Sequence, residues 1–467
     1  MNKYKKLIGN TVIFAIGSFS STLLVFLLMP LYTRVLTTSD YGVMDIIVNT
    51  SNLLIPIVMV SINEGIIRFG LDRSVRKSDV LSTGLGVCLA GFLVFGLFIP
   101  LMKRVEFISS YTMLIYAYVL AGCLKSVVSQ FVRAIGYVKL YAFDGILSTF
   151  TTVVFNILLL VVFKWGINGY VLSTVLSNVL SVLFLFWIAN LKKFVKPRQV
   201  SPAIAKAMLV YSLPLIPTTI FWWITNVSGR YMVTYFLGES ANGLFSVAYK
   251  IPTVITMISG IFSQAWQISA VTEADDPGQS RFYSDIFSSY QTVVFMCASG
   301  VLLLIKPITA ILVSEAFYPS WKYVPFLVLS VIFSCFVTFL GTFYMVAKKN
   351  AMALVTTCVG AGLNLVLNYF LIPKYGVNGA AFATFACYFT VFVLRAVDTR
   401  RIVRLDLGLG RMALNTLGVA AQALCLLYEV KFLYPIQIGI VLLLCLVNLK
   451  SIGRLLFQAL RMVGIRL

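Results

Sequence analysis

The chain has 467 residues, of which 60% are hydrophobic and only 11% are charged. A soluble domain carries about 25% charged residues because water must solvate its surface. This composition therefore excludes a chain built from two or three soluble domains. Lipid must cover most of the outer surface, so the sequence predicts an integral, multi-pass membrane protein.

Three further totals limit the chemistry. The chain has no histidine, which removes the usual general base, proton shuttle and zinc ligand. Its eight cysteines all lie in apolar runs without a C-x-x-C pair, so we expect neither disulfides nor metal ligation. We also expect no bound cofactor. The net charge of +21 is more typical of basic cytoplasmic loops than of a nucleic-acid site.

Apolar runs long enough to cross the hydrocarbon, about 20 residues each, recur along the whole chain. They predict an all-α fold with fourteen membrane-spanning helices. The first run follows three lysines but is too long for a signal peptide, so we expect it to be retained. The predicted spans are 8–32, 42–67, 80–101, 111–132, 140–163, 167–189, 207–236, 242–270, 286–312, 323–346, 351–372, 377–397, 412–428 and 434–449.

The loop charges predict the orientation, because Lys and Arg collect on the cytoplasmic side. With the N-terminus inside, 26 Lys and Arg residues fall in cytoplasmic segments and 9 fall outside. We therefore expect both termini in the cytoplasm of a bacterial inner-membrane protein. The last segment, 451–467, carries Arg454, Gln458 and Arg461 on one side of a helix. It predicts an amphipathic helix on the cytoplasmic leaflet.

Short motifs indicate an internal duplication. W-G-I-N-G at 165–169 recurs as Y-G-V-N-G at 375–379, and Tyr41-Gly42 matches Asn242-Gly243. Six spans per copy make a parallel repeat, and two-lobed transporters place the substrate path between such halves. The expected organisation is an N-terminal lobe at 1–200, a C-terminal lobe at 201–405, two additional transmembrane helices at 406–450 and the tail at 451–467.

Charged and polar side chains interrupt several predicted spans. They are Asp45, Asn49 and Glu64 in the second span, Lys125 in the fourth, Arg230 in the seventh and Lys250 in the eighth. A charge near the bilayer centre costs about 2.5–3.5 kcal/mol and normally faces a partner or a wet cavity. Two interpretations stay open. The group lines a cationic cavity suited to an anionic cargo, or it forms structural pairs, Glu64 with Lys125 and Asp45 with Lys250 or Arg230.

Several motifs carry a resemblance to a known family. M-P-L-Y-T-R-V-L at 29–36, followed by D-Y-G at 40–42, resembles the opening of bacterial oligosaccharide flippases and polysaccharide-biosynthesis transporters. These belong to the multidrug/oligosaccharidyl-lipid/polysaccharide exporter superfamily. S-L-P-L-I-P at 212–217, G-R-Y at 229–231 and N-G-L-F-S-V-A-Y-K at 242–250 are similar to the second-half pattern, which has an arginine near the end of the seventh span. Phe245 stands in place of the usual Tyr. The resemblance covers residues 1–400 approximately.

The resemblance implies two six-helix lobes in a V shape and two extra C-terminal helices. It also implies alternating-access transfer of undecaprenyl-pyrophosphate-linked sugar repeats for surface polysaccharides such as O-antigen or exopolysaccharide. By motif position, Arg34, Arg230 and Lys250 would bind the pyrophosphate and acidic sugars. Lys125 is added because of its depth in the span and its helix face. Asn49 is added because it occupies, in the first half, the position that Lys250 has in the second. Glu64 is added because it is a charged residue within a span.

The expected partners are the lipid-linked oligosaccharide and membrane lipids, with a polysaccharide polymerase or ligase as a further partner, and no nucleic acid. The alternative is the drug-efflux branch of the superfamily, coupled to Na⁺ or H⁺, which would use acidic groups such as Asp45 and Glu64. The cationic excess and the two additional spans count against it. A membrane enzyme is disfavoured because the chain lacks histidine, a large outer loop and a paired-carboxylate motif.

Overall fold

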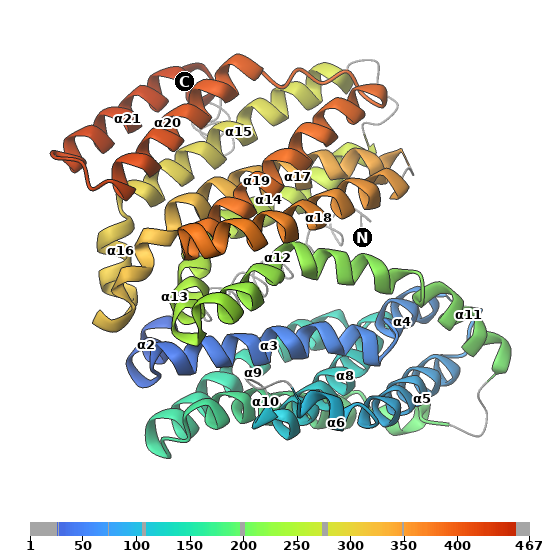
Figure 1. Ribbon diagram of the computed structural model, residues 1–467. Helices are drawn as coiled ribbons and strands as arrows, with labels where there is room; N and C mark the ends of the chain where they lie inside the picture. Colours follow the sequence, from blue (N-terminus) through green and yellow to red (C-terminus); the bar gives the residue numbers. More distant parts are fainter. Residues whose placement is uncertain are drawn as a thin grey trace. The chain divides into compact units, whose positions relative to one another are not determined.

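The computed structural model describes residues 26, 28–72, 74–104, 109–196, 201–272, 279–347 and 350–453. Within these ranges the regular elements are all helices, and no strand occurs (Figure 1). Eleven described helices are long and apolar enough to cross a membrane. A bent pair, Glu239–Lys250 with Thr253–Ser263, brings the number to twelve when it is counted as one span. The expected class, an all-α multi-pass membrane protein, is confirmed.

Twelve of the fourteen predicted spans correspond to these helices. The first predicted span, 8–32, lies almost entirely outside the described residues, as does the amphipathic tail beyond residue 453. The last, predicted at 434–449, is α21, Leu433–Val447. At 15 residues, α21 is shorter than the roughly 20 residues that cross the hydrocarbon.

The chain divides into two compact units, Met1–Trp223 and Ile224–Leu467, and the division falls within α12, Leu215–Leu237. The second unit includes the last two helices. The expected boundary at residue 200 and the separate status of 406–450 stay predictions.

The first unit is a helical bundle centred on α8, which packs against α3, α4, α5 and α10. Side chains of α8 such as Val119, Val127 and Phe131 are fully buried, as expected for a helix that neighbours surround. Its helices are α2 Met29–Val35, α3 Thr38–Val58, α4 Ile62–Leu71, α5 Lys77–Gly96, α6 Ile99–Met102, α8 Thr112–Ala134, α9 Val138–Asn156, the π-helix η1 Ile157–Val162, α10 Gly166–Ile188, η2 Leu191–Phe194 and α11 Pro202–Ser212.

The predicted span 42–67 is broken into α3 and α4. Val60 and Ser61 join them with φ of 54° and 49°, a left-handed conformation that is unusual for a β-branched residue. Pro56 lies just before the break, and proline cannot donate the amide bond that would continue the helix ladder. The amide of Ser61 instead donates to the Pro56 carbonyl oxygen over 2.7 Å. The length and hydropathy of the run predicted one continuous helix, and Pro56 was the local signal of a break.

The second unit is centred on α17, which packs against α14, α15, α19 and α20. Aromatic rings fill much of its interior, and Phe339 of α17 stacks on Trp266 with ring centroids 4.4 Å apart. In Figure 1, α20 and α21 lie beside α15. Its helices are α13 Glu239–Lys250, α14 Thr253–Thr272, α15 Gln279–Leu303, α16 Ile305–Leu312, η4 Glu315–Tyr323, α17 Val324–Val346, α18 Asn350–Tyr375, α19 Val377–Asp398, η5 Thr399–Arg401, α20 Leu409–Leu427 and α21.

Arg395 joins three helices of this unit. It projects from α19, is 8% exposed, and donates to the Val337 carbonyl of α17 over 2.9 Å. It also donates to the Thr356 hydroxyl of α18 over 3.1 Å. Gly341 of α17 leaves the space, because a Cβ there would lie 2.8 Å from the guanidinium. The buried charge is solvated by neutral oxygens, which a charge inside a membrane bundle requires.

Candidate functional site

Lys125 is half-buried on α8 and donates a hydrogen bond to the hydroxyl of Ser148 on α9. The Ser148 hydroxyl lies 3.3 Å from that of Ser177 on α10, and Ser177 is 2.8 Å from the hydroxyl of Thr151. We call Lys125, Asp144, Ser148, Thr151, Ser177 and Ser181 the Lys125 cluster. Its hydroxyls hold the ammonium where α8, α9 and α10 meet.

Asp144 is the acidic member of the Lys125 cluster. It lies on α9, is 2% exposed, and accepts a hydrogen bond of 2.6 Å from Ser181 of α10. Its charge interacts favourably with that of Lys125. The sequence analysis did not single out Asp144. The available signal was an acidic residue inside the apolar run 140–163, four positions before Ser148 on the same helix face.

The proposed pairing of Glu64 with Lys125 is wrong. Glu64 is exposed in the first turn of α4 and accepts a hydrogen bond of 2.9 Å from the amide of its neighbour Asn63. Lys125 instead donates a hydrogen bond to Ser148, and the acidic group that attracts its charge is Asp144. Counting residues from the loops places Glu64 and Lys125 at a similar depth in the membrane. Whether two such side chains meet depends on the helix face from which each one projects.

The other two candidates of the first unit, Arg34 and Asn49, do not share contacts with Lys125 in the described part of the chain. Arg34 is exposed in the last turn of α2. Asn49 is half-buried on α3 and donates to the Asp45 carbonyl oxygen over 2.8 Å. The Asn49 carbonyl accepts a bond of 3.1 Å from the Trp223 indole. Among the described residues, no hydrogen bond or ion pair joins Arg34, Asn49, Glu64 and Lys125 to one another.

In the second unit, Arg230 lies beside the residue that precedes Lys250. The Arg230 guanidinium carbon is 4.7 Å from the centroid of the Tyr249 ring, within the range of a cation–π contact. The Tyr249 hydroxyl is 3.1 Å from that of Thr384 on α19. Lys250 is half-buried as the last residue of α13. The structure therefore brings Arg230 and the end of α13 together, which the sequence analysis did not specify.

An amide and hydroxyl network continues from Arg230 along α12. Asn226 accepts a bond of 2.6 Å from the Tyr388 hydroxyl of α19. Ser228 donates to Asn364 of α18 over 3.1 Å, and Asn368 donates to the same oxygen over 2.8 Å. The sequence analysis did not single out this network, because the α18 and α19 partners lie more than 100 positions away in the chain.

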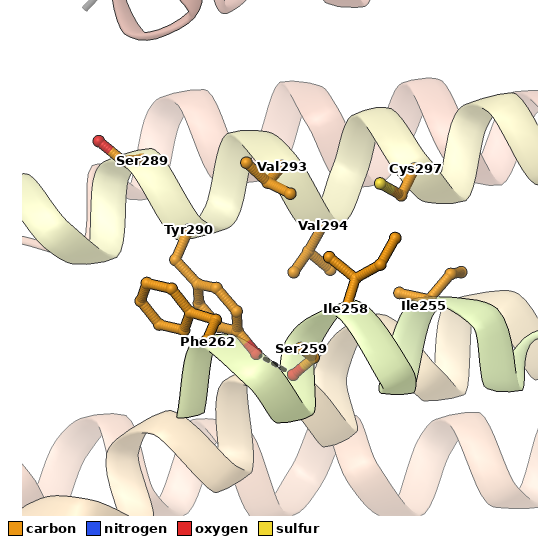
Figure 2. A pocket seen from close by; sticks show the side chains of 9 residues that line it. All are labelled: Ile255, Ile258, Ser259, Phe262, Ser289, Tyr290, Val293, Val294 and Cys297. Atoms are coloured by element: carbon orange, nitrogen blue, oxygen red, sulfur yellow. Dashed lines mark hydrogen bonds between the residues drawn. The ribbon is translucent and has the colours of Figure 1, made fainter. Parts of the chain in front are cut away.

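Figure 2 shows a cavity of about 80 Å³ between α14 and α15. Its lining is almost entirely apolar, and the Ser259 and Tyr290 hydroxyls, 2.5 Å apart, bond to each other at one end. Phe262 stacks on Tyr290 with centroids 4.3 Å apart. This cavity has no charged lining residue, so it does not suit an anionic cargo. Within the described residues, no group of three His, Cys, Asp or Glu side chains is arranged to hold a metal ion.

Solved structures with the same fold are membrane transporters and flippases. The chain aligns with "Lipid II flippase MurJ, inward closed conformation" at a TM-score of 0.71 and 14% identity, over 96% of this chain and 100% of that one. An inward-facing multidrug resistance MATE family transporter of the MOP superfamily aligns at 0.62 and 14% identity, over 84% and 94%.

A third structure is a MOP superfamily transporter from Pyrococcus furiosus, described as having a binding pocket of reverse polarity. It aligns at a TM-score of 0.58 and 15% identity, over 88% of this chain and 96% of that one. No curated protein sequence matches the chain. The sequence model described as "Polysaccharide biosynthesis protein" matches residues 7–267, more than half of the chain. The chain therefore belongs to the polysaccharide biosynthesis protein family.

Proposed function

We propose that the protein is a flippase that moves an undecaprenyl-pyrophosphate-linked oligosaccharide from the cytoplasmic to the outer leaflet of the bacterial inner membrane by alternating access. The product serves surface polysaccharide synthesis, such as O-antigen or exopolysaccharide, and a polymerase or ligase consumes it. The protein acts as a transporter and not as an enzyme. Membership of the polysaccharide biosynthesis family and the MurJ-like fold support this proposal.

One observation carries the proposal furthest: each unit holds a half-buried basic side chain on membrane-spanning helices, Lys125 in the first and Arg230 in the second. Lys125 donates to the Ser148 hydroxyl, and the Arg230 guanidinium lies over the Tyr249 ring. A cationic side chain inside a bilayer is costly, so such residues normally face a partner or a water-filled path. They suit a pyrophosphate, whose oxygens form strong charge-assisted hydrogen bonds.

We assign cargo binding to Lys125, Arg230 and Lys250, with Asn49 as a neutral polar contact. Arg34 and Glu64 are exposed at helix ends, so their contribution would be to attract or orient the head group at an entrance. The coupling ion stays open between Na⁺ and H⁺.

The test is deletion of the gene followed by complementation with variants. Cells without the protein should accumulate lipid-linked repeat units on the cytoplasmic side and lose surface polysaccharide. Lys125→Gln and Arg230→Gln should fail to restore polymer at normal protein levels. Lys103→Gln and Arg104→Gln are matched controls, because both side chains are exposed after α6, and they should complement fully.

The same strains separate the efflux alternative. Normal surface polysaccharide in the deletion strain, together with increased sensitivity to cationic dyes, would contradict the flippase proposal and favour drug export. Accumulated lipid-linked units with unchanged dye sensitivity would support flipping.

A further inference from the structure

A seam of polar residues, most of them buried, joins α15 to α20 and α21 within the second unit. On α15 it contains Ser288, Thr292 and Ser299, and on α20 it contains Arg411, Asn415 and Gln422. Both helices use the same spacing of four and then seven residues. Eleven residues are slightly more than three full turns, so each set lies along one helix face. The partners on α21 and just beyond it are Gln437, Asn448 and Ser451.

The seam has three successive levels along the helices, and direct hydrogen bonds join the helices at the first, around Arg411. Arg411 donates to the Ser451 hydroxyl over 2.6 Å and to the Ser288 hydroxyl over 2.8 Å. The two serine hydroxyls are themselves 3.3 Å apart. This level joins all three helices through one guanidinium.

The second level is also satisfied. Asn415 and Asn448 exchange amide hydrogen bonds of 3.2 and 2.7 Å, and Thr292 donates to the Asn448 oxygen over 3.2 Å. All three side chains are at most 1% exposed. Reciprocal amides of this kind stabilise helix contacts in lipid, where no water competes for the bonds.

The third level is different. Gln422 is 0% exposed, yet neither its amide oxygen nor its amide nitrogen has a partner among the described residues. Gln437 is 1% exposed and donates to the Gln422 backbone carbonyl over 2.9 Å, but its own amide oxygen has no described partner. Ser299, 0% exposed, has an unpartnered hydroxyl in the same described set. Ser299 follows Thr292 by seven residues, as Gln422 follows Asn415, so each lies about two turns beyond the residues of the second level.

We propose that water occupies a buried polar site at the Gln422 side chain, where α15, α20 and α21 meet, and bridges Gln422 to Ser299 and Gln437. An unpaired polar atom is costly inside a bilayer, and these residues present four such atoms on one seam. A buried water needs two to four polar partners. Water can accept from the Gln422 amide nitrogen and donate to the amide oxygens, so it matches both kinds of atom.

The chemistry favours water over a metal cation. The site contains amides and a hydroxyl but no carboxylate, and one of its atoms is an N–H donor that would repel a cation. An entirely dry site would leave the donor and the acceptors unsatisfied. With the bridging water, hydrogen bonds join α20 and α21 to α15 at all three levels.

The direct test is a high-resolution cryo-electron microscopy map of the full chain in lipid nanodiscs. We expect a density peak within hydrogen-bond distance of the Gln422 amide. The absence of a peak, with Gln422 bonded directly to Ser299 or Gln437, would overturn the proposal. This measurement uses the unmodified protein, so it does not depend on whether a variant folds.

Thermal unfolding gives a second test, because a hydrated site and a dry site predict opposite changes of Tm when Gln422 is replaced. Gln422→Leu should lower Tm by several degrees, since it strands the water with its remaining partners, and Ser299→Ala should lower it less. A higher Tm for Gln422→Leu would overturn the proposal, because only a dry site gains from losing two unpaired atoms. Thr416→Leu, on another face of α20, is the matched control and should leave Tm nearly unchanged.

Salt composition separates water from a cation. The Tm of the unmodified protein should be equal in NaCl, KCl and choline chloride at one ionic strength. A rise specific to Na⁺ or K⁺ that disappears in Gln422→Leu would overturn the water assignment in favour of a cation site.

Discussion

The guanidinium of Arg230 lies over the ring of Tyr249, 4.7 Å from its centroid, and the Tyr249 hydroxyl lies 3.1 Å from that of Thr384. Tyr249, which precedes Lys250 in the chain, thus contacts both a cation of α12 and the Thr384 hydroxyl of α19. A ring face attracts a cation without removing its charge, so the Tyr249 ring helps to orient the Arg230 guanidinium.

This arrangement predicts different effects for two substitutions of Tyr249. Tyr249→Phe keeps the ring face and should retain most transport. Tyr249→Leu removes the cation–π contact, worth about 1–2 kcal/mol when partly desolvated, and should lower the transport rate about tenfold. The measurement is the rate of flipping of a lipid-linked oligosaccharide in proteoliposomes. Equal loss in both variants would show that the hydroxyl, not the ring, is what matters.

A double substitution in the Lys125 cluster separates stability from function. Lys125→Gln leaves Asp144 without its cation and should lower the free energy of unfolding by about 2 kcal/mol. Adding Asp144→Asn should restore stability, because the stranded charge is gone, but should not restore transport. Thermal unfolding and the proteoliposome assay measure the two properties separately. Recovery of transport in the double variant would reduce Lys125 to a structural role.

The charge of Lys250 should matter more than its shape. Lys250→Arg should keep partial activity, whereas Lys250→Gln and Lys250→Glu should lose it at unchanged membrane abundance. Protein level by immunoblot and surface polysaccharide in complemented cells report the two quantities. Wild-type polymer with Lys250→Gln would remove this residue from the cargo site.

The contact between α5 and the broken second span predicts a steric effect at one glycine. A Cβ at Gly91 would lie 1.8 Å from the Val58 carbonyl oxygen, whereas a Cβ at Gly86 on the same helix meets nothing within 4 Å. Gly91→Ala should therefore cost at least about 1–3 kcal/mol of stability, and Gly86→Ala should be neutral or slightly stabilising. Comparison of the two Tm values in detergent tests this. Equal stability would mean that α3 and α5 separate easily.

The topology expected from the loop charges is tested with reporter fusions. A reporter active only outside the cell should be active after Lys322 and silent after Lys193, Lys349 or Leu467. An active fusion at Leu467 would contradict an even number of spans with both termini inside.

Local sequence determined the membrane class and most of the span positions. Hydropathy is a property of each run of residues, so twelve predicted spans could be found without tertiary information. The same is true of the family, because its motifs, such as P-L-Y-T-R at 30–34, are contiguous in the chain. Lys125 and Arg230 could be named as candidates because a charge inside an apolar run stands out wherever the helix lies.

Tertiary structure alone decided which of these charges meet. Depth along a span can be counted, but the partner of Lys125 depends on how α8 is rotated against α9 and α10. Its ammonium therefore meets Ser148 of α9 and not Glu64. The left-handed backbone of Val60 and Ser61, which separates α3 from α4, could not be predicted from the hydropathy of the span. Likewise, Gln422 is an ordinary polar residue in the sequence. Only the packing of α15, α20 and α21 buries it completely, because hydrogen-bond partners are set by distances between helices and not by spacing along one of them.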